Sequence, residues 1–511
     1  MQLLDMEMHL HETLFAYHPF TLLSFIFIFS TLMLLRLLLK RRSWGEQKLN
    51  LPPSPPKLPI IGNLHQIGFQ LHRSIHNLSE KYGPLMFLRL GYLPTLVVSS
   101  AEMAKEIKVN HDIAFANRPQ TSAVKLSLYG CVDVAFCPYG EYWAQVRKIS
   151  VVELLSTKKV RSFKSVREEE IALMIQKISQ SSSMGAPVNV SELATALTND
   201  IVCRCVLGRK HGNSNNGDLA GKLLKLQTAV TFSDLFPWLG WIDNLTGLMG
   251  RIKNISRELD IFYDQVIDEH LIHENKHDNP DYNKDFIDVL LQIQKHHTNF
   301  TRENIKAIIM DMFIGGTEST STTIEWAFAE LVKNPNVMRK AQEEVRRVVG
   351  KKNKVDEEDI HQMQYLKLVI KESMRLHPAV AINVLESSMV TNIRGFHVPA
   401  NTRLIINNWS IQRDAKQWER PDEFIPERFS YNPIDFKGKD YAFIPFGAGR
   451  RICPGISFAM IIVESAVANL LYWFDWKTLQ GGEELDMTEG FRVTVTVKTV
   501  PLRLIAVPHF S

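Results

Sequence analysis

The spacing of apolar and polar positions predicts a chain that is mainly helical with a few short strands. Beyond residue 65, apolar residues recur mostly at helical spacing, whereas Leu85–Leu90, Thr95–Ser99 and the alternating run Val493–Lys498 have the pattern of strands. Polar, turn-rich stretches at 212–217 and 273–283 separate helical segments. The pattern therefore predicts an α+β fold, mainly α with small β-sheets.

The longest predicted helix has an unusual centre. It begins after Thr301, a favourable N-cap, and ends before Pro335, so at about 1.5 Å per residue it spans roughly 45 Å and must cross its whole domain. Adjacent glycines, Gly315 and Gly316, cost about 1 kcal/mol each relative to alanine. They either kink a packing helix or let a flat group approach the backbone. The neighbouring side chains that can relay protons are Glu318, Ser319 and Thr320.

The N-terminal region, residues 1–42, has the composition of a membrane anchor. Residues 20–39 carry no charge except Arg36, which can snorkel, and the run is about long enough to cross a bilayer. Lys40, Arg41 and Arg42 follow it and acids precede it, so the positive-inside rule places the rest of the chain in the cytosol. A cleaved signal peptide is the alternative, but no small-residue cleavage site follows. We expect a retained signal-anchor helix.

A stiff connector leads from this anchor into one large domain. Five prolines between Pro52 and Pro59 make Leu51–Leu64 stiff and extended, within a basic, proline-rich hinge expected at residues 43–64. No further long linker divides the chain, so residues 65–511 are expected to form a single catalytic domain.

Composition and charge exclude several classes of protein. The 511 residues are 45% apolar and 22% charged, as in a globular protein with a sizeable core. The net charge of +4 is spread among 55 acids without basic blocks, so we assign no nucleic-acid role. Five cysteines are too few and too odd for a secreted disulfide framework, which favours a reducing compartment.

One of these cysteines stands in a loop suited to a metal. The sequence FGAGRRICPG, residues 446–455, lies just ahead of an apolar helical stretch. Gly449 and Gly455 permit tight turns on either side of Cys453, so backbone N–H groups can point at the sulfur, while Arg451 adds a cation that can pair with an anionic ligand group. A closed zinc site needs four ligands, and no second Cys or His lies near. A lone thiolate suits haem, whose macrocycle supplies four donors.

This loop carries a resemblance to a known family. The pattern F-x-x-G-x-R-x-C-x-G, filled by Phe446, Gly449, Arg451, Cys453 and Gly455, resembles the haem-binding signature of the cytochrome P-450 monooxygenases. Three further motifs stand in that family's order: Trp143-x-x-x-Arg147, which resembles a pair that binds a haem propionate; Gly315-Gly316-Thr317-Glu318, which resembles the oxygen-binding helix; and Glu372-x-x-Arg375 with Arg428, which resembles a Glu-Arg-Arg network below the haem. The resemblance covers essentially the full chain, and the stretches FCPYGEYW and DLFPWLGWID are similar to the plant A-type enzymes of specialised metabolism.

The resemblance implies a haem-thiolate monooxygenase in the endoplasmic reticulum membrane. It implies haem b ligated by Cys453, molecular oxygen as a co-substrate, and electrons from NADPH through a membrane-bound flavoprotein reductase, with cytochrome b5 as a further donor. Lys148 and Arg450 are expected to face the acidic surface of the reductase. The expected substrate is a hydrophobic small molecule, terpenoid or alkaloid-like. The segments expected to contact it are 121–134, 232–241, 313–317, 380–384 and 491–493.

The oxygen-binding motif departs from the family's pattern at one position. Where the family has a threonine that assists proton delivery, this chain has Ser319, followed by Thr320. Serine keeps the hydroxyl but loses the methyl group that restricts χ1. A conservative replacement and an altered proton delivery, which would favour desaturation or C–C and C–O coupling over hydroxylation, are both open.

A second departure follows Arg375. Related enzymes carry an arginine there that contacts a propionate, whereas this chain has HPAVAINVLES, with Leu385 nearest to the missing residue. The propionates would then be held by Trp143, Arg147 and Arg451. Asn383 adds an amide that either orients a polar substrate atom or satisfies local backbone.

Two other functions stay open at the level of the sequence. The first is a haem-thiolate enzyme that isomerises, dehydrates, desaturates or couples, which dependence on reductant and incorporation of labelled oxygen would separate from hydroxylation. The second is a non-catalytic, membrane-anchored haem-binding protein. Four intact residues argue against the second, namely Cys453, Glu372, Arg375 and Glu318, because a binding protein has no need of a proton-relay acid beside the glycine pair.

Overall fold

The chain divides into two compact units, Met1–Leu51 and Pro52–Ser511. The computed structural model describes residues 23–34, 36, 49–210, 231–272, 283–296, 298–479, 485–492 and 495–510. In the first unit, Leu23–Leu34 forms an apolar helix with exposed side chains. The rest of the anchor predicted at residues 20–39, apart from Arg36, and the turn-rich stretches at 212–217 and 273–282 lie outside the described residues.

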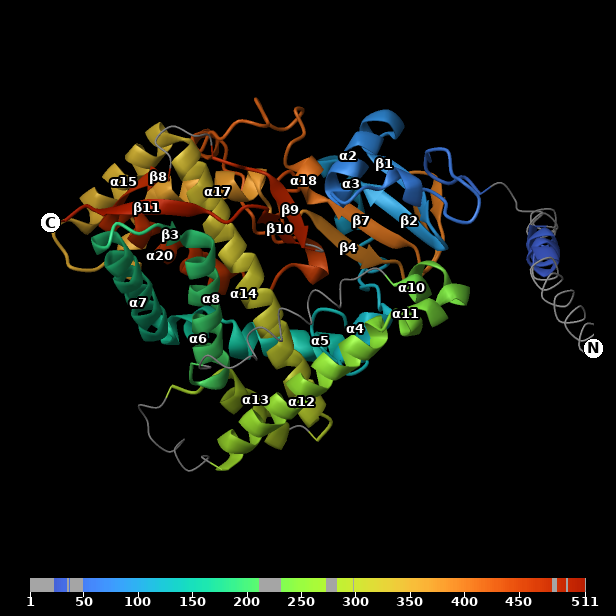
Figure 1. The fold of residues 1–511 in the computed structure, drawn as a ribbon, viewed down its shortest axis with the longest axis horizontal. Coiled ribbons are helices and arrows are strands. Elements are labelled where there is room, and N and C mark those ends of the chain that lie inside the picture. The colour runs from blue at the N-terminus through green and yellow to red at the C-terminus, as the bar shows by residue number, and fades with distance from the viewer. Residues whose placement is uncertain are drawn as a thin grey trace, which may run out of the picture. The chain divides into compact units, whose positions relative to one another are not determined.

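The second unit combines many helices with small sheets, which confirms the predicted α+β class (Figure 1). Its longer helices are α2 (Leu71–Tyr82), α3 (Ala101–Asn110), α5 (Glu141–Lys148), α7 (Lys164–Ser183), α8 (Val190–Leu207), α12 (Leu248–Ile272), α13 (Phe286–His296), α14 (Arg302–Lys333), α15 (Pro335–Val349), α17 (Gln364–Leu376) and α20 (Ile456–Trp473). Its shorter helices are α4 (Ser122–Ser127), α6 (Thr157–Ser162), α10 (Phe232–Leu235), α11 (Trp241–Leu245), α16 (Glu357–Ile360), α18 (Asn408–Ile411) and α19 (Arg428–Tyr431).

The largest sheet joins segments that lie about three hundred residues apart in the chain. Its strands, in spatial order, are β1 (Leu85–Leu90), β2 (Leu93–Val98), β7 (Arg403–Asn407) and β4 (Ile382–Glu386). Only the β2–β7 pair is parallel. The strand predicted at Leu85–Leu90 is confirmed. The one predicted at Thr95–Ser99 begins two residues earlier, at Leu93, and ends one residue earlier, at Val98.

The remaining strands form three smaller sheets among the described residues. They are β3 (Val188–Asn189) with β11 (Arg503–Pro508) and β8 (Phe474–Thr478), β5 (Thr391–Ile393) with β6 (Phe396–Val398), and β9 (Glu489–Arg492) with β10 (Val495–Lys498). Strand β10 corresponds to the run predicted at 493–498, whose first two residues lie outside the described part of the chain.

The proline-rich segment packs onto β1. The carbonyl of Pro53 accepts a hydrogen bond from the Phe87 N–H (2.8 Å), and Asn63 exchanges two hydrogen bonds with the backbone of Arg89 (2.6 and 2.9 Å). Gly62, at φ +62°, makes this approach possible, because a Cβ there would lie 2.0 Å from the Arg89 carbonyl oxygen. The structure thus places Pro52–Leu64 within the second unit, not outside it.

Helix α14 crosses the second unit between the largest sheet and the helices α7, α8 and α20 (Figure 1). Thr301 caps it as predicted: its hydroxyl accepts from the Asn304 N–H (3.4 Å), and the Asn304 side chain accepts from the Thr301 N–H (2.6 Å). The helix continues through the glycine pair without a break to Lys333. Helix α20 packs against it and is long and apolar enough to span a membrane, but 67% of it is buried inside this unit, so it is a core helix.

An ion pair between α12 and α13 makes stability depend on pH. His270 Nδ1 bonds to the Val266 carbonyl (2.7 Å) and Nε2 to the Asp285 carboxylate (2.8 Å), so the cluster with Asp288 leaves neither ring nitrogen for a metal. Burial acts to lower the pKa of His270, but the hydrogen bond to Asp285 and its charge outweigh it and raise the pKa to about 9.

We therefore expect this pair to stabilise the fold fully below pH about 6.5, the ordinary pKa of histidine, and to lose that contribution as the pH rises through about 9. Its size is on the order of 2 kcal/mol. Urea unfolding of the wild type and of His270→Gln between pH 6 and 10 should show two curves that converge at high pH. A constant gap between them would contradict the assignment.

Candidate active site

The predicted cysteine loop folds as a closed turn that leads into α20. The N–H of Cys453 donates to the Phe446 carbonyl (3.0 Å), and Gly449 takes the left-handed conformation at φ +72°. A Cβ at Gly449 would lie 2.6 Å from an Asp112 carboxylate oxygen, so only glycine fits. Gly455 is the N-cap of α20, and its N–H points at the Cys453 sulfur (3.4 Å). The sulfur therefore sits at a helix N-terminus, where a thiolate is favoured.

The roles expected of Gly455 and Arg451 differ in the structure. Gly455 has an ordinary φ of −91°, so no special turn is needed there. Arg451 is buried and donates to the carbonyl oxygens of Ala116 (2.7 Å), Val134 (3.1 Å), Ala135 (3.4 Å) and Cys137. These bonds use four of its five N–H groups, so at most one remains for an anionic ligand. Arg451 mainly joins the cysteine loop to residues 134–137.

Trp143 and Arg147, expected to bind a propionate together, have different roles in the structure. Trp143 is buried, donates its indole N–H to the Val134 carbonyl (3.2 Å) and stacks under Arg451, whose guanidinium carbon lies 4.4 Å from the ring centre. Its N–H is therefore not available for a propionate. Arg147 donates to the Ile452 carbonyl, next to the cysteine. Burial lowers the pKa of Arg147, and the charge of Cys453 acts to raise it. Arg147 stays a candidate anion ligand.

Arg118 is a further cation that sequence reasoning missed. It is half-buried, and its Nη1 donates to Asn383 Oδ1 (3.0 Å) and to the Val384 carbonyl (2.9 Å). Its Nε–H is buried without a partner. Burial lowers the pKa of Arg118, while Asp133 and Cys453 act to raise it, which places the guanidinium near the cysteine. No periodicity or motif in the sequence marks this residue.

The structure places another cation, Arg118, near the segment that lacks the expected arginine. Leu385, on β4, is fully buried in an apolar cluster and presents no polar group. Asn383, two residues earlier, lies against the cysteine loop, because a Cβ at Gly447 would be 3.1 Å from its amide nitrogen. Its carbonyl oxygen orients Arg118. The structure therefore favours the local, positioning role for Asn383 and supplies a cation from another segment.

The two glycines of α14 serve different purposes. A Cβ at Gly316 would lie 3.0 Å from a methyl group of Val202 on α8, so this glycine permits close helix packing. A Cβ at Gly315 would meet nothing within 4 Å, and Gly315 is exposed although it stands mid-way along a helix that is otherwise mostly buried. The helix therefore borders an internal space at Gly315, as expected if a flat group lies there.

The three predicted proton-relay residues do not lie on one face. Ser319 follows Gly315 by one turn, remains partly exposed, and donates its hydroxyl to the Gly315 carbonyl (2.7 Å). Glu318 is also partly exposed. Thr320 is 2% exposed and points into the packed side of the helix, away from Gly315. The structure brings Ser319 and Glu318 to the internal space and does not bring Thr320 there.

A buried pair of carboxyl groups, also missed, ties α14 to the loop before α5. Asp311 Oδ2 accepts from the N–H groups of Val134 (2.6 Å) and Ala135 (3.2 Å). Burial and the charge of Asp133 raise the pKa of Asp311, and burial raises the pKa of Asp133 to about 6. A charged residue in the apolar first half of the helix was the signal that could have found Asp311.

The predicted Glu372, Arg375 and Arg428 meet in one buried network. Arg375 donates two hydrogen bonds to the Glu372 carboxylate (2.8 and 2.9 Å), and Arg428 donates one (2.9 Å). The other N–H groups of Arg375 donate to backbone carbonyls of Gln412, Pro421 and Glu423. Glu372 and Arg375 have fully buried side chains, and no donor of Arg375 is left over. The network joins α17 to residues 412–428.

The residues around Cys453 fit a haem. Burial raises the pKa of the Cys453 thiol, while the Gly455 N–H and the charges of Arg147 and Arg118 act to lower it. Cys453 nevertheless remains partly exposed. A sulfur that is deep in the protein but not covered borders an internal space. The unpartnered Nε–H of Arg118 and the sparsely bonded Arg147 are cations suited to carboxylate groups. Gly315 leaves room for a flat group.

Comparisons with known proteins agree with this fit. The family model described as cytochrome P-450 matches residues 52–506. Cytochrome P-450 71A1 of Persea americana is 52% identical over 88% of this chain and 92% of its own length. Desmethylyatein synthase of Sinopodophyllum hexandrum is 48% identical over 93% of this chain and 96% of its own length. Strychnine-11-hydroxylase of Strychnos nux-vomica is 42% identical over 95% of this chain and 98% of its own length.

Proposed function

We propose, from the premise that this chain belongs to the cytochrome P-450 family and is a haem-thiolate monooxygenase, that it hydroxylates a hydrophobic plant specialised metabolite. The observation that carries the proposal is a partly exposed cysteine, Cys453, whose sulfur lies at the N-terminus of α20, the helix that packs against α14. The relatives are named for different compounds: desmethylyatein, phenylacetaldehyde oxime and strychnine. Relatedness therefore supports a small specialised metabolite and selects no one compound, and the terpenoid or alkaloid-like class is our proposal.

The residues would act as follows. Cys453 would ligate the haem iron, and Arg118 and Arg147 would bind its carboxylates, with one N–H of Arg451 in addition. The bound haem supplies oxygen activation, which the thiolate promotes by donating electron density. Ser319 and Glu318 would hold the proton that this chemistry consumes, at the side of α14 that borders the internal space. The Glu372 network would fix the backbone beneath the cysteine loop.

The reaction class is tested with labelled oxygen. Membranes that contain the protein, NADPH and a plant NADPH-dependent reductase are screened against terpenoids and alkaloids, and the product is analysed for ¹⁸O from ¹⁸O₂. One labelled oxygen atom per product is expected. Turnover without reductant would indicate an isomerase or dehydratase, product without label a desaturase or coupling enzyme, and no turnover with any compound a binding protein.

Electron supply is proposed to come from a membrane-bound flavoprotein reductase, with cytochrome b5 as a further donor. Lys148 is exposed at the end of α5 and supports an electrostatic contact. Arg450 is half-exposed but pairs with Asp112 (3.0 Å), so it is a weaker contact than expected. Lys148→Glu should lower the rate of haem reduction by the reductase, and an unchanged rate would contradict this contact.

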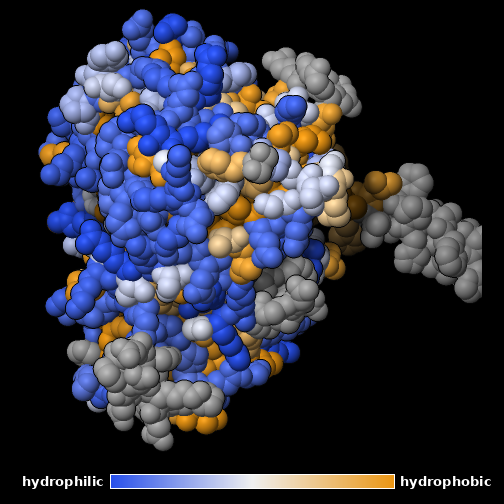
Figure 2. All heavy atoms as spheres, turned by 90° about the vertical axis from the view of Figure 1, so that its left-hand side faces the viewer, coloured by the Kyte–Doolittle hydropathy of each residue, from blue (hydrophilic) through white to orange (hydrophobic). Residues whose placement is uncertain are grey.

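The proposed location is the endoplasmic reticulum membrane, with the second unit in the cytosol. Within that unit, exposed aromatic residues gather around α10, α11 and the β1–β2 turn. Tyr92, in the turn, packs edge-on against Trp238, with 5.5 Å between the ring centroids, and Phe232 and Trp241 are exposed nearby in the sequence. This exposure suits lipid better than a buried substrate. The face that carries α7 and α15 is mostly hydrophilic (Figure 2). Carbonate-washed microsomes should retain the protein, and its release would contradict this location.

Substitutions at Ser319 test the proposed proton delivery. Ser319→Ala is expected to lower the product formed per NADPH consumed by about tenfold and to raise peroxide release, because the hydroxyl that holds a proton beside the internal space is lost. Thr320→Ala should have a much smaller effect, since Thr320 faces the packed side. Ser319→Thr separates the open alternatives: a changed ratio of hydroxylated to desaturated or coupled product favours altered delivery, and an unchanged ratio favours simple replacement.

A further inference from the structure

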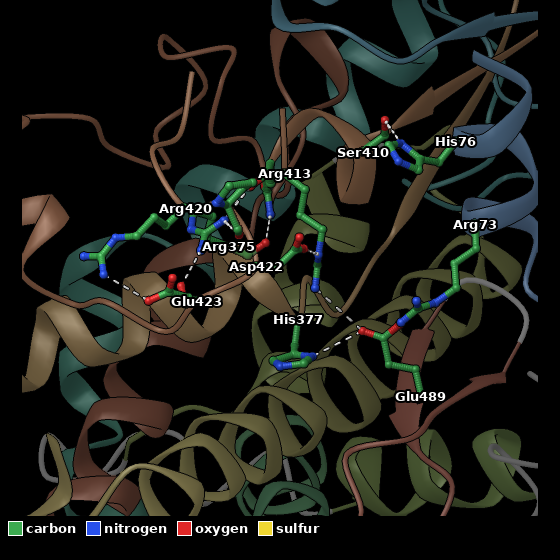
Figure 3. Close-up of polar contacts among 12 residues, drawn as sticks. Arg73, His76, Arg375, His377, Ser410, Arg413, Arg420, Asp422, Glu423 and Glu489 are labelled. Carbon is green, nitrogen blue, oxygen red and sulfur yellow. Dashed lines mark hydrogen bonds and ion pairs between the residues drawn. The ribbon is translucent and has the colours of Figure 1, made fainter. Parts of the chain in front are cut away.

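A second cluster of buried charge surrounds Glu489, the first residue of β9 (Figure 3). Its side chain is 2% exposed, and its carboxylate faces four nitrogen groups from three separate segments. They are Arg73 Nη2 at 2.7 Å, His72 Nε2 at 3.4 Å, His377 Nδ1 at 3.2 Å and Arg413 Nη2 at 4.0 Å. None of these residues belongs to the site around Cys453.

His377 links this carboxylate to the central helix. Its Nε2 lies 2.7 Å from a carboxylate oxygen of Glu330 on α14, while Nδ1 faces Glu489. Its ring stacks on Trp326, also on α14, with 4.0 Å between centroids and 3° between planes. The imidazole is therefore fixed in position, tilt and rotation by two acceptors and one aromatic face.

The same contacts hold the β9–β10 hairpin. The Trp326 indole N–H donates to the Thr496 carbonyl (2.7 Å), and the Thr496 N–H donates to the carbonyl of Ala379 (2.9 Å). Val495 pairs with Val380 in an isolated bridge. Val380 is three residues beyond His377 and half-exposed, at the start of the segment 380–384 expected to contact substrate. Glu489 and His377 thus anchor both sides of the contact between the hairpin and this segment.

Glu489 keeps its negative charge near neutral pH. Burial acts to raise the pKa of Glu489, but the hydrogen bonds from His377 and His72 and the charge of Arg413 outweigh it and hold the pKa far below its usual range. Arg73 and Arg413 also lie on the Trp409 ring, 4.9 and 4.1 Å from its centre. These contacts are suited to a fixed support.

We propose that Glu489 and His377 are positioning residues that set the distance of Val380 and the β9–β10 hairpin from α14, and thereby limit the size of substrate that fits beside the haem. This deepens the proposed function and rests on it. Neither residue touches the haem-binding residues named above, so the effect should appear in the binding of bulky molecules and not in the iron's own ligation.

The test compares a small and a bulky iron ligand in the haem-loaded protein. Imidazole and clotrimazole are titrated into wild type and Glu489→Gln, and binding is followed by the shift of the Soret band. Loss of the charge is expected to change the clotrimazole Kd by about tenfold and to leave the imidazole Kd within about twofold. Hydrogen exchange of the peptide 485–499 should rise in the variant.

A matched control and a second variant keep the result interpretable. Glu423→Gln makes the same chemical change in a pair with Arg420 (3.1 Å) whose side chains are both more than half exposed, and it should alter neither Kd (Figure 3). Trp326→Phe removes the indole N–H that holds the hairpin from the α14 side, so it should repeat the selective change even where Glu489→Gln does not fold.

The possible outcomes separate this inference from the proposed function. Equal changes for both azoles, or none for either, in protein with a normal carbon monoxide spectrum would overturn the positioning role while the haem-thiolate assignment stands. Absence of the red-shifted carbon monoxide band in the wild type would overturn both. A clotrimazole change confined to the Glu489 and Trp326 variants supports the inference.

Discussion

Cys453→Ser is expected to abolish the strongly red-shifted Soret band that the wild type shows when reduced under carbon monoxide. The band requires a thiolate on the iron, and Cys453 is the cysteine whose sulfur borders the internal space, whereas the other four are buried. Product formation should fall by more than about 100-fold, because the serine oxygen donates far less electron density to the iron. Difference spectra of membranes and turnover with reductase measure both effects.

Cys205→Ala is the matched control for this change. Cys205 is fully buried in the apolar core of α8, and burial raises the pKa of its thiol to about 12, so it is an inert thiol. The control should keep the red-shifted band. A wild-type band in Cys453→Ser would show that another residue ligates the iron and would remove the observation on which the proposed function rests.

Glu372→Gln is expected to lower the free energy of unfolding by about 3–5 kcal/mol, because it leaves the fully buried Arg375 guanidinium, and Arg428 beside it, without a countercharge. The network fixes residues 412–428, which precede the cysteine loop. Part of the variant protein should therefore lose haem or show a carbon monoxide band that lacks the red shift. Thermal unfolding and difference spectra of the purified protein measure these two effects.

An exposed ion pair supplies the comparison. Lys164 and Glu358 lie 2.7 Å apart, and Glu358 is 69% exposed, so Glu358→Gln should cost less than about 1 kcal/mol. If Glu372→Gln were no more destabilising than Glu358→Gln, the buried network would not be what supports the cysteine loop.

Local signals in the sequence were sufficient for the secondary structure that positions the site. The Thr301 cap and the proline at 335 delimited α14 to within a residue, and the apolar run at Leu85–Leu90 gave β1 its bounds. These features depend on interactions within a few residues, which the sequence displays directly. The spacing around Cys453 likewise predicted the closed loop ahead of α20.

The partners of the charged groups could not be predicted in the same way. Arg451 and Trp143 were expected to bind an anion. The Trp143 indole N–H and all but one of the Arg451 N–H groups instead donate to carbonyls of residues 116 and 134–137, because backbone acceptors that folding buries there must be paired. Arg118 and Asp311, which no motif marks, instead lie beside the site. Thr320 lies on the packed side of α14, because tertiary packing decides which side of the helix faces inward.

The sequence by itself determined the class of this protein: a cysteine loop, a long helix with a glycine pair, a Glu-Arg-Arg set and an apolar N-terminal run in one order. Each depends on spacing along the chain. The tertiary structure alone decided which cations face the internal space, which hydroxyl borders it, and how Glu489 meets His377 across more than a hundred residues. Those contacts arise from burial, which requires every enclosed polar group to find a partner wherever the fold supplies one.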